Sequence, residues 1–293
     1  MIRYGPLTRQ QIEDLIDRHD PTWRAKAADR TKILEHEGRY LDGPPDWGDV
    51  KLVFMRLQNF KCAFCERPLA RAFAGSIEHD VEHFRPKGSI KAWPRKTRGR
   101  TSDYDFNTGD ASASGYHWLA FEVENYATAC KPCNTIRKSN CFPIEQQRGK
   151  PNADIRSLNA SEQPLLIFPI GEIDDDPSDL ITFEGIVAVP RHKRGRKHRR
   201  ARITIDFFAL NEREELWEDR FRAIALVYMA MEVLHSNPDP TKQAAARRRL
   251  GDAVSDNSPH ASCARAFLAT MTADYAKAWT YYTYAEAALR TTG

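Results

Sequence analysis

Apolar residues recur at helical spacing along the first sixty positions of the chain. Thr8 and Gln11 form a capping-box pair ahead of an apolar face, which predicts a first helix. A second helix is expected over 22–37, and a Gly/Pro-rich connection over 38–49 leads to a third. The apolar positions of the first and third helices are Ile12, Leu15, Ile16, Val50, Val53, Phe54 and Leu57.

The middle of the chain changes character twice. Residues 88–115 are polar, basic and rich in Gly, Ser and Thr, which indicates a long surface loop. Residues 165–208 contain three segments of strand composition, LLIFPI, LITFEGIVAV and RITIDFFAL, and predict a small β-rich region. A basic run lies between the last two segments, and we expect it to form an exposed hairpin loop or a mobile arm.

From Asn211 onward the apolar positions return to a helical period. Asn211 and Glu214 favour a helix start, and Pro238 and Pro240 interrupt the pattern. The periodic positions of this helix are Leu216, Trp217, Phe221, Ile224, Tyr228, Met231 and Leu234. Two or three further helices follow and end in the aromatic-rich segment AWTYYTYAEAAL. The predicted fold class is therefore α+β, with helices towards both ends of the chain.

The composition is that of a globular protein. The chain has 293 residues, enough for one or two domains with a real core. Hydrophobic residues make up 41% and charged residues 29%, which excludes wholesale disorder. No apolar run approaches the length of a membrane-spanning helix, and the first residues lack the apolar stretch of a signal peptide. We therefore expect a cytoplasmic protein without a membrane partner.

The net charge of +4 is modest, but the charges are segregated along the chain. Residues 191–202 hold eight Lys and Arg in twelve positions, whereas 172–184 hold six acids in thirteen. We expect the basic run to contact phosphates of nucleic acid, and an intramolecular clamp with the acidic run is the alternative. The candidate nucleic-acid contacts are Arg194, Arg196, Lys197, Arg199 and Arg200.

The spacing of the cysteines predicts a metal site. Two C-x-x-C pairs are separated by 64 residues, and together they offer four thiolates to one tetrahedral, structural zinc ion. Disulfides are not expected in a cytoplasmic chain. The pairs are Cys62 with Cys65 and Cys130 with Cys133, while Cys141 and Cys263 stand alone as ordinary thiols.

Residues suited to acid–base and metal chemistry lie around these pairs. Glu82 and His83 are adjacent within SIEHDVEHFRPKG, Asn125 precedes the second pair, and Asn134 follows its last cysteine. A neutral imidazole can take a proton from water near pH 7. Carboxylate and amide oxygens suit Mg²⁺, which a closed thiolate site does not bind. These residue types suit hydrolysis assisted by a metal ion, in a role separate from that of the zinc.

This combination resembles the HNH, or ββα-metal, endonucleases in the form that carries two zinc-binding pairs. The resemblance implies a zinc-stapled ββα core in which His83 is the general base. It also implies that Glu82 and Asn134 hold one catalytic Mg²⁺ or Mn²⁺, and that Asn125 braces the loop. The expected regions are an N-terminal helical segment (1–46), the nuclease module with its zinc site (47–150), a β-rich extension with the basic loop (151–210) and a C-terminal helical region (211–293).

Charged residues close to this motif are further candidates. His79 and Asp80 are alternative ligands of the divalent cation. Arg85, Lys87 and Lys138 are expected to contact the nucleic-acid backbone beside the scissile bond.

The phrases EHFRPKG, YHWLAFEVEN, CFPI and FFALNER are similar to the PtuB-like branch of HNH proteins, found in Septu and retron antiphage systems. This resemblance implies a partner ATPase of the ABC/SMC type and a nuclease effector for which DNA is favoured and RNA is possible. The insertion at 88–115, Ser139 in place of the usual Gly and Tyr126 in place of Leu depart from the pattern. The alternative is a non-catalytic zinc module that binds nucleic acid or docks a partner.

Overall fold

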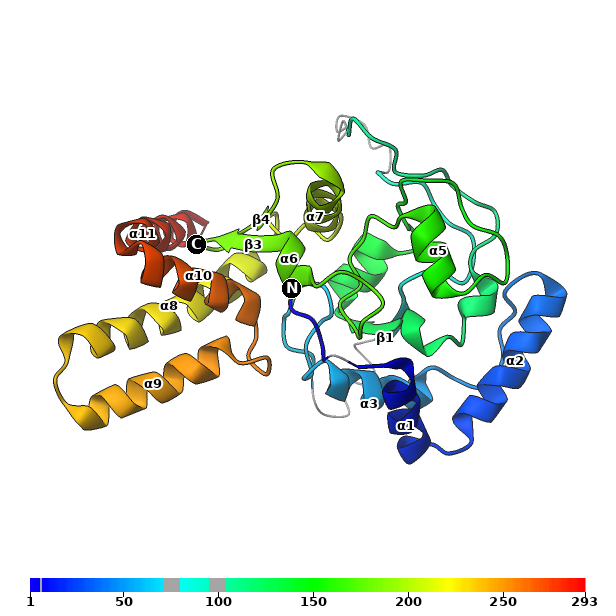
Figure 1. The fold of residues 1–293 in the computed structure, drawn as a ribbon, viewed down its shortest axis with the longest axis horizontal. Coiled ribbons are helices and arrows are strands. Elements are labelled where there is room, and N and C mark those ends of the chain that lie inside the picture. The colour runs from blue at the N-terminus through cyan, green and yellow to red at the C-terminus, as the bar shows by residue number, and fades with distance from the viewer. Residues whose placement is uncertain (6, 71–79, 95–103, 293) are drawn as a thin grey trace. The chain divides into compact units, whose positions relative to one another are not determined.

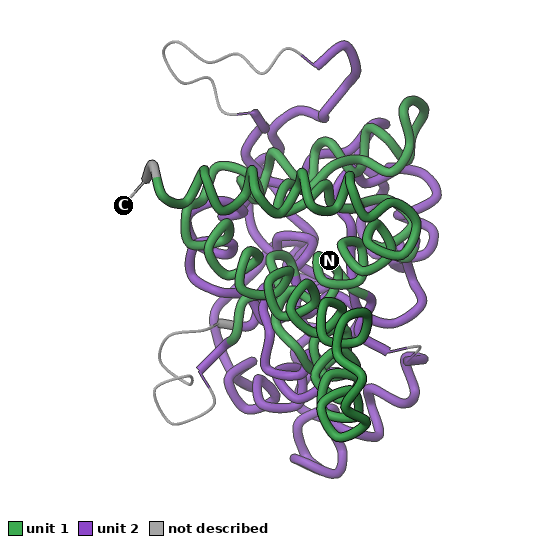
Figure 2. The backbone as a smooth tube through the Cα atoms, turned by 90° about the vertical axis from the view of Figure 1, so that its left-hand side faces the viewer, with its two compact units in different colours: residues 1–2, 64–68, 176–293 green, residues 3–63, 69–175 purple. Residues whose placement is uncertain are grey.

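The structure is a computed structural model that describes residues 1–5, 7–70, 80–94 and 104–292. The chain divides into two compact units (Figure 2). Unit 2 comprises residues 3–63 and 69–175, and unit 1 comprises residues 1–2, 64–68 and 176–293. Helices alternate with two small antiparallel sheets, which confirms the predicted α+β class. Among the described residues, no helix combines the length and apolarity needed to cross a membrane.

Unit 2 begins with the three predicted helices and continues into a two-stranded sheet (Figure 1). Thr8 caps the first helix in the expected capping box with Gln11. The sheet pairs β1 with β2 so that Glu82 lies opposite Ala127 and His83 opposite Tyr126. The elements are α1 (Arg9–His19), α2 (Trp23–Glu37), α3 (Gly48–Leu57), β1 (Asp80–His83), the short 3-10 helices η1 (His117–Leu119) and η2 (Val123–Asn125), β2 (Tyr126–Ala129), the π-helical turn η3 (Pro132–Lys138) and α5 (Ile155–Glu162).

Unit 1 is a helical assembly around a tight hairpin. Its hairpin, β3–β4, turns at Gly185 with φ of 58°, packs on α10 and contacts α7 through β4. The helices α8 and α9 lie against each other, and α10 and α11 pack on α8 (Figure 1). The elements are α6 (Pro177–Leu180), β3 (Ile181–Glu184), β4 (Val187–Pro190), α7 (Gly195–Phe207), α8 (Glu214–Ser236), α9 (Pro240–Val254), α10 (Ala261–Ala273) and α11 (Tyr275–Thr292).

Two of the three predicted strand segments are wrong. Residues 202–207 belong to α7. The alternating apolar pattern therefore does not mark a strand with one buried face, because consecutive residues of this segment are buried: Ile203, Thr204 and Ile205, as well as Phe207. The preceding Arg, Lys and Ala residues are strong helix formers and extend the helix backward through the basic run. Residues 165–170 are buried but form no ladder, and Ile170 makes only an isolated bridge with Tyr4.

Candidate functional site

The four predicted zinc ligands form one group. The sulfur atoms of Cys62, Cys65, Cys130 and Cys133 all lie within 4.8 Å of one another, and all four residues are buried. A tetrahedral zinc with bonds of about 2.3 Å would place its sulfurs about 3.8 Å apart, so this group can hold one ion. Among the described residues it is the sole group of three or more Cys, His, Asp or Glu with that property.

Local backbone geometry brings the second cysteine pair together. The N–H groups of Cys133 and Asn134 both donate to the carbonyl oxygen of Cys130, at 2.9 and 3.0 Å. This turn leads directly from β2 into η3. At the first pair, the N–H of Ala63 donates to the carbonyl oxygen of Thr128 at 3.1 Å, which ties the turn at Cys62 to β2.

His83 ends β1 in a closely packed aromatic setting. Its ring meets the rings of Trp47 and Tyr126 edge to face, at centroid distances of 4.8 and 5.2 Å. Its Nε2 lies 3.0 Å from the carbonyl oxygen of Ala120. The same oxygen accepts hydrogen bonds from the Trp47 Nε1–H at 2.8 Å and the Tyr126 hydroxyl at 2.5 Å.

The Ala120 carbonyl determines which ring nitrogen of His83 carries the proton. A carbonyl oxygen only accepts, so the Nε2 facing it is protonated and donates. In the neutral imidazole the lone pair then lies on Nδ1. Within the described part of the chain, Nδ1 of His83 has no hydrogen-bond partner, so it is the nitrogen available to take a proton.

The surroundings keep this imidazole neutral. Burial lowers the pKa of His83 to about 3, and the nearby Lys87 and Lys138 cations act in the same direction. The hydrogen bond to Ala120 opposes this shift. The ring is therefore unprotonated at physiological pH, as a proton acceptor must be.

Glu82 and Lys138 form a buried ion pair beneath His83. The Lys138 Nζ lies 2.5 Å from Glu82 Oε1 and donates to the carbonyl oxygen of His83 at 2.8 Å. Both side chains are almost completely inaccessible to solvent, at 0% and 7% exposure. Lys138 is thus tied into the sheet from the end of η3.

Asn125 links the end of β1 to η1. Its Oδ1 accepts the N–H of Arg85 at 2.7 Å, and its Nδ2 donates to the carbonyl oxygens of Arg85 and Leu119, each at 3.1 Å. The fourth predicted site residue, Asn134, is half-buried in η3. Its side chain makes no hydrogen bond within the described residues, whereas its backbone carbonyl accepts the N–H of Ser139.

The three basic residues predicted beside the motif differ in their surroundings. Arg85 is buried, pairs with Glu162 and donates to Asn159 Oδ1 at 2.8 Å, and Lys138 is buried as described above. Lys87 is half-buried, with its ammonium 3.4 Å from the centre of the Trp47 ring. Burial lowers the pKa of Lys87 to about 8 despite the acids around it. Of the three, Lys87 is therefore the one placed to meet a ligand.

From Gly195 onward the basic run is helical, which corrects the expectation of an exposed loop or mobile arm. Arg194 and Lys197 are exposed near the start of α7, whereas Arg196 and Arg199 are half-buried and Arg200 is buried at 1% exposure. One side of α7 packs into unit 1, so the basic residues alternate between solvent and the interior. Contact of this run with nucleic acid stays a prediction for its exposed members.

Two predicted ligands have no described side chain, and two residues that contact His83 were not predicted. The alternative ligand His79 lies outside the described residues, and the same holds for the side chain of Asp80. Trp47 and Ala120 were not predicted, although both contact His83. Ala120 acts through its backbone, so no side-chain pattern could indicate it. Trp47 lies in the Gly/Pro-rich connection, where its proximity to His83 depends on tertiary packing.

Comparisons with known proteins bear on this arrangement. No family model and no solved structure matches the chain. The chain is similar to the Septu protein PtuB of Bacillus mycoides (strain KBAB4), with 32% identity over 171 residues. This confirms the predicted resemblance to PtuB-like proteins of Septu systems. The match covers 58% of this chain, and the chain spans about half the length of that relative, 49%.

Proposed function

We propose that this protein hydrolyses phosphodiester bonds of nucleic acid as an HNH endonuclease, with His83 as the general base. The observation that carries the proposal is the hydrogen bond from His83 Nε2–H to the Ala120 carbonyl, which leaves Nδ1 as the proton acceptor. The order of β1, β2 and η3 supports a ββα core around this residue. We assign to Asn125 the role of bracing the loop, from its three hydrogen bonds.

In the proposed reaction, Nδ1 of His83 takes a proton from a water molecule, and the resulting hydroxide attacks phosphorus. The P–O ester bond opposite the hydroxide breaks, and the leaving oxygen takes up a proton from solvent. A phosphate group bound beside the ring would raise the pKa of His83 from its low value in the free protein, because an anion favours the imidazolium. The half-buried Lys87 ammonium offsets part of the charge that develops on the phosphate oxygens. Trp47 and Tyr126 hold the ring in place.

The proposal includes a divalent cation, Mg²⁺ or Mn²⁺, held by Glu82 and Asn134. These residues fit a cation only after the Lys138 ammonium leaves the Glu82 carboxylate, which it contacts at 2.5 Å. The bound ion would supply charge stabilisation at the phosphate. The Lys138 ammonium neutralises Glu82 and donates to the backbone carbonyl of His83.

We assign zinc to the four-cysteine group in a structural role. All four thiolates are engaged in a closed site of this kind, so no position is open for substrate. The ion would connect the turn at Cys62 with β2 and η3, which carry Lys138 and Asn134.

The similarity to a Septu protein supports a place in an antiphage defence system. We propose that the chain is its cytoplasmic nuclease effector and acts with an ATPase of the ABC/SMC type. DNA is the favoured substrate and RNA the second candidate. A non-catalytic zinc module is the competing function, favoured by one observation: His83 is only 8% exposed.

The decisive experiment is cleavage of plasmid, single-stranded DNA and tRNA with Mg²⁺ or Mn²⁺, by the purified chain alone and with any ATPase encoded beside it. His83→Ala should reduce the rate by about 10²–10⁴-fold, since it removes the general base. The matched control is His117→Ala, which removes another buried imidazole. The proposal assigns that imidazole no role in the reaction. Equal rates for His83→Ala and wild type would refute the assignment. Absence of cleavage under every condition would favour the non-catalytic function.

A further inference from the structure

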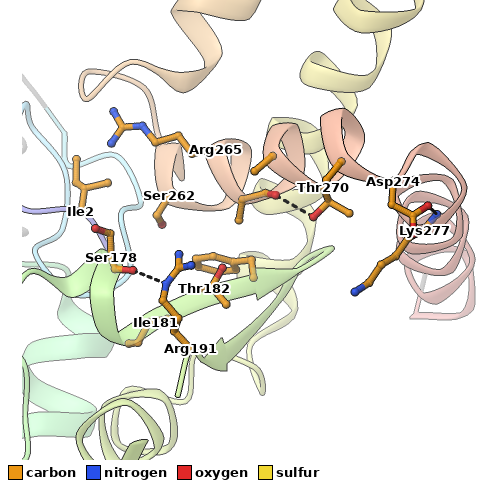
Figure 3. A pocket seen from close by; sticks show the side chains of 14 residues that line it. Ile2, Ser178, Ile181, Thr182, Arg191, Ser262, Arg265, Thr270, Asp274 and Lys277 are labelled. Atoms are coloured by element: carbon orange, nitrogen blue, oxygen red, sulfur yellow. Dashed lines mark hydrogen bonds between the residues drawn. The ribbon is translucent and has the colours of Figure 1, made fainter. Parts of the chain in front are cut away.

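Unit 1 contains a cavity of about 500 Å³ that is not used in the proposed hydrolysis. Figure 3 shows β3 along one side and α10 along the other, with Lys277 extending from the start of α11. Three basic side chains line the cavity, together with hydroxyl groups and small apolar residues. A cavity of this size accommodates a small organic ligand.

Arg191 presents an oriented guanidinium to this cavity. Its Nε donates to the carbonyl oxygen of Ser178 at 2.8 Å, and its backbone N–H donates to Leu180. The first bond orients the guanidinium (Figure 3), and the second fixes the backbone of Arg191 directly after β4. Within the described part of the protein, its terminal nitrogens have no further hydrogen bond and no carboxylate partner. A planar guanidinium held in this way suits two oxygens of one phosphate group.

Lys277 supplies a second cation. Its ammonium lies 5.6 Å from the centre of the Tyr281 ring and has no carboxylate partner among the described residues. Asp274 also lines the cavity, but its Oδ1 accepts the backbone N–H of Lys277 at 3.0 Å and so caps α11. The positive end of that helix offsets part of the carboxylate charge. Arg265 differs from the other two cations, because it is paired with Asp256 at 2.6 Å.

The remaining wall is apolar and leaves space for a flat group. Phe183 of β3 is buried at this wall, and α10 contributes Ala266, Ala269 and Ala273. Their short side chains keep the space between helix and hairpin open. A ligand with an anionic end and a planar, weakly polar body would therefore meet suitable groups on both sides.

We propose that this cavity binds a nucleotide, with anionic phosphate oxygens on Arg191 and Lys277, which lie toward opposite ends of the cavity, and with its base against Phe183 and the alanines of α10. The nucleotide is either free or part of a single strand, since both sources present the same chemistry. Binding here needs neither His83 nor a divalent cation, so it stands or falls separately from the proposed hydrolysis.

The test is equilibrium binding to the full chain without divalent cations, so that no hydrolysis occurs. Three probes are compared: ATP, a single-stranded thymidine oligonucleotide of about ten nucleotides, and inorganic phosphate. ATP or the oligonucleotide should bind more tightly than phosphate, and whichever binds more tightly identifies the source. If neither binds, or if phosphate binds equally well, the nucleotide proposal is overturned.

Variants locate the binding. Arg191→Ala with Lys277→Ala should weaken it by about tenfold or more per cation, because charged hydrogen bonds are lost. Ala269→Trp fills the cavity without changing charge and should also abolish binding. The matched control, Lys242→Ala with Arg249→Ala, removes two exposed cations of α9 and should leave the affinity within about twofold. Circular dichroism and melting temperature identify folded variants. Wild-type affinity in folded Ala269→Trp, or equal losses in the control, would place the binding elsewhere.

Discussion

The two antiparallel hairpins in the described part of the chain have the same size and opposite character. β1–β2 and β3–β4 are each four residues against four in antiparallel pairing. The strands of the second hairpin are joined by Gly185 and Ile186, whereas 84–125 separates those of the first. A two-stranded sheet is marginal by itself in water. What holds each hairpin must therefore lie outside the pair of strands.

β3–β4 is held by ordinary amphipathic packing. Ile181 and Phe183 are buried against unit 1 while Glu184 and Val187 face solvent, so apolar and exposed positions largely alternate. Side chains of this kind stabilise a hairpin through burial of apolar area on one face. Any apolar residues of similar volume would serve the same purpose.

β1–β2 instead buries polar groups, most of which are paired, although the Thr128 hydroxyl has no hydrogen-bond partner among the described residues. Glu82, His83 and Thr128 are all buried, and all four residues of β2 are buried. Gln58 brackets Thr128 by accepting its N–H at 2.7 Å and donating to its carbonyl at 2.8 Å. Lys138 neutralises Glu82. Burying polar groups costs free energy unless each is paired, so stability alone does not favour this composition. This composition agrees with the proposal that β1–β2, rather than β3–β4, carries the reaction.

The largest loss of stability is expected when the proposed zinc site beside β1–β2 is removed. Cys133→Ser should abolish zinc binding and unfold the region around β2 and η3, because structural zinc contributes about 10–16 kcal/mol in small metal-dependent folds. Metal analysis and thermal unfolding measure both effects. Cys141→Ser, which changes a buried thiol outside the group, should retain zinc. Folded, zinc-free wild-type protein would contradict the assignment.

A smaller but still large effect is expected from the buried ion pair. Lys138→Met leaves the Glu82 carboxylate buried without its ammonium, which should lower the free energy of unfolding by about 3–5 kcal/mol. The double variant with Glu82→Gln should recover part of this loss, because no buried charge is left. Lys131→Met, an exposed lysine at the start of η3, is the control and should change stability by less than about 0.5 kcal/mol. Denaturant titration decides, and equal losses for the two lysines would contradict this account.

Sequence patterns predicted the local features of both regions. Capping at Thr8, the N-terminal helices and the grouping of the cysteines follow from short-range spacing, and the structure agrees with each. The resemblance to PtuB-like proteins likewise rests on short phrases and agrees with the similarity to a Septu protein, whereas the role of His83 stays a prediction. These features need no knowledge of how distant segments pack.

What the sequence did not indicate depends on tertiary contacts. The polar sequence EHFRPKG predicts an exposed Arg85, but Arg85 is buried and forms an ion pair with Glu162 of α5. The alternating apolar residues after Arg202 resemble a strand, yet α7 buries them on several sides. Ala120 contributes a carbonyl, which every residue has. Such features arise from segments far apart in sequence, and periodicity carries no information about them.

The buried imidazole of β1–β2 should make stability depend on pH in a defined direction. His83 has its pKa lowered to about 3 in the folded chain, whereas the unfolded chain takes up a proton near 6.5. Between these values the unfolded state binds more protons, so stability falls as pH falls below about 6.5. The expected slope is about 1.4 kcal/mol per pH unit for this group. Denaturant midpoints from pH 7 to 5 measure it for wild type and His83→Gln, whose slope should be shallower. An unchanged slope would show that His83 is not the group responsible.

The last prediction compares the same substitution, Glu to Gln, in both hairpins, and the smallest expected effect is the one in β3. Glu184→Gln removes an exposed charge from β3 and should alter the free energy of unfolding by no more than about 0.5 kcal/mol. Glu82→Gln removes a charge at a buried position of β1 and leaves the Lys138 ammonium without its counter-charge, so its cost should be several times larger. Denaturant titration of the two single variants gives the ratio directly. Costs of similar size would mean that the polar interior of β1–β2 is no more constrained than the solvent face of β3–β4, and the distinction between the hairpins would fail.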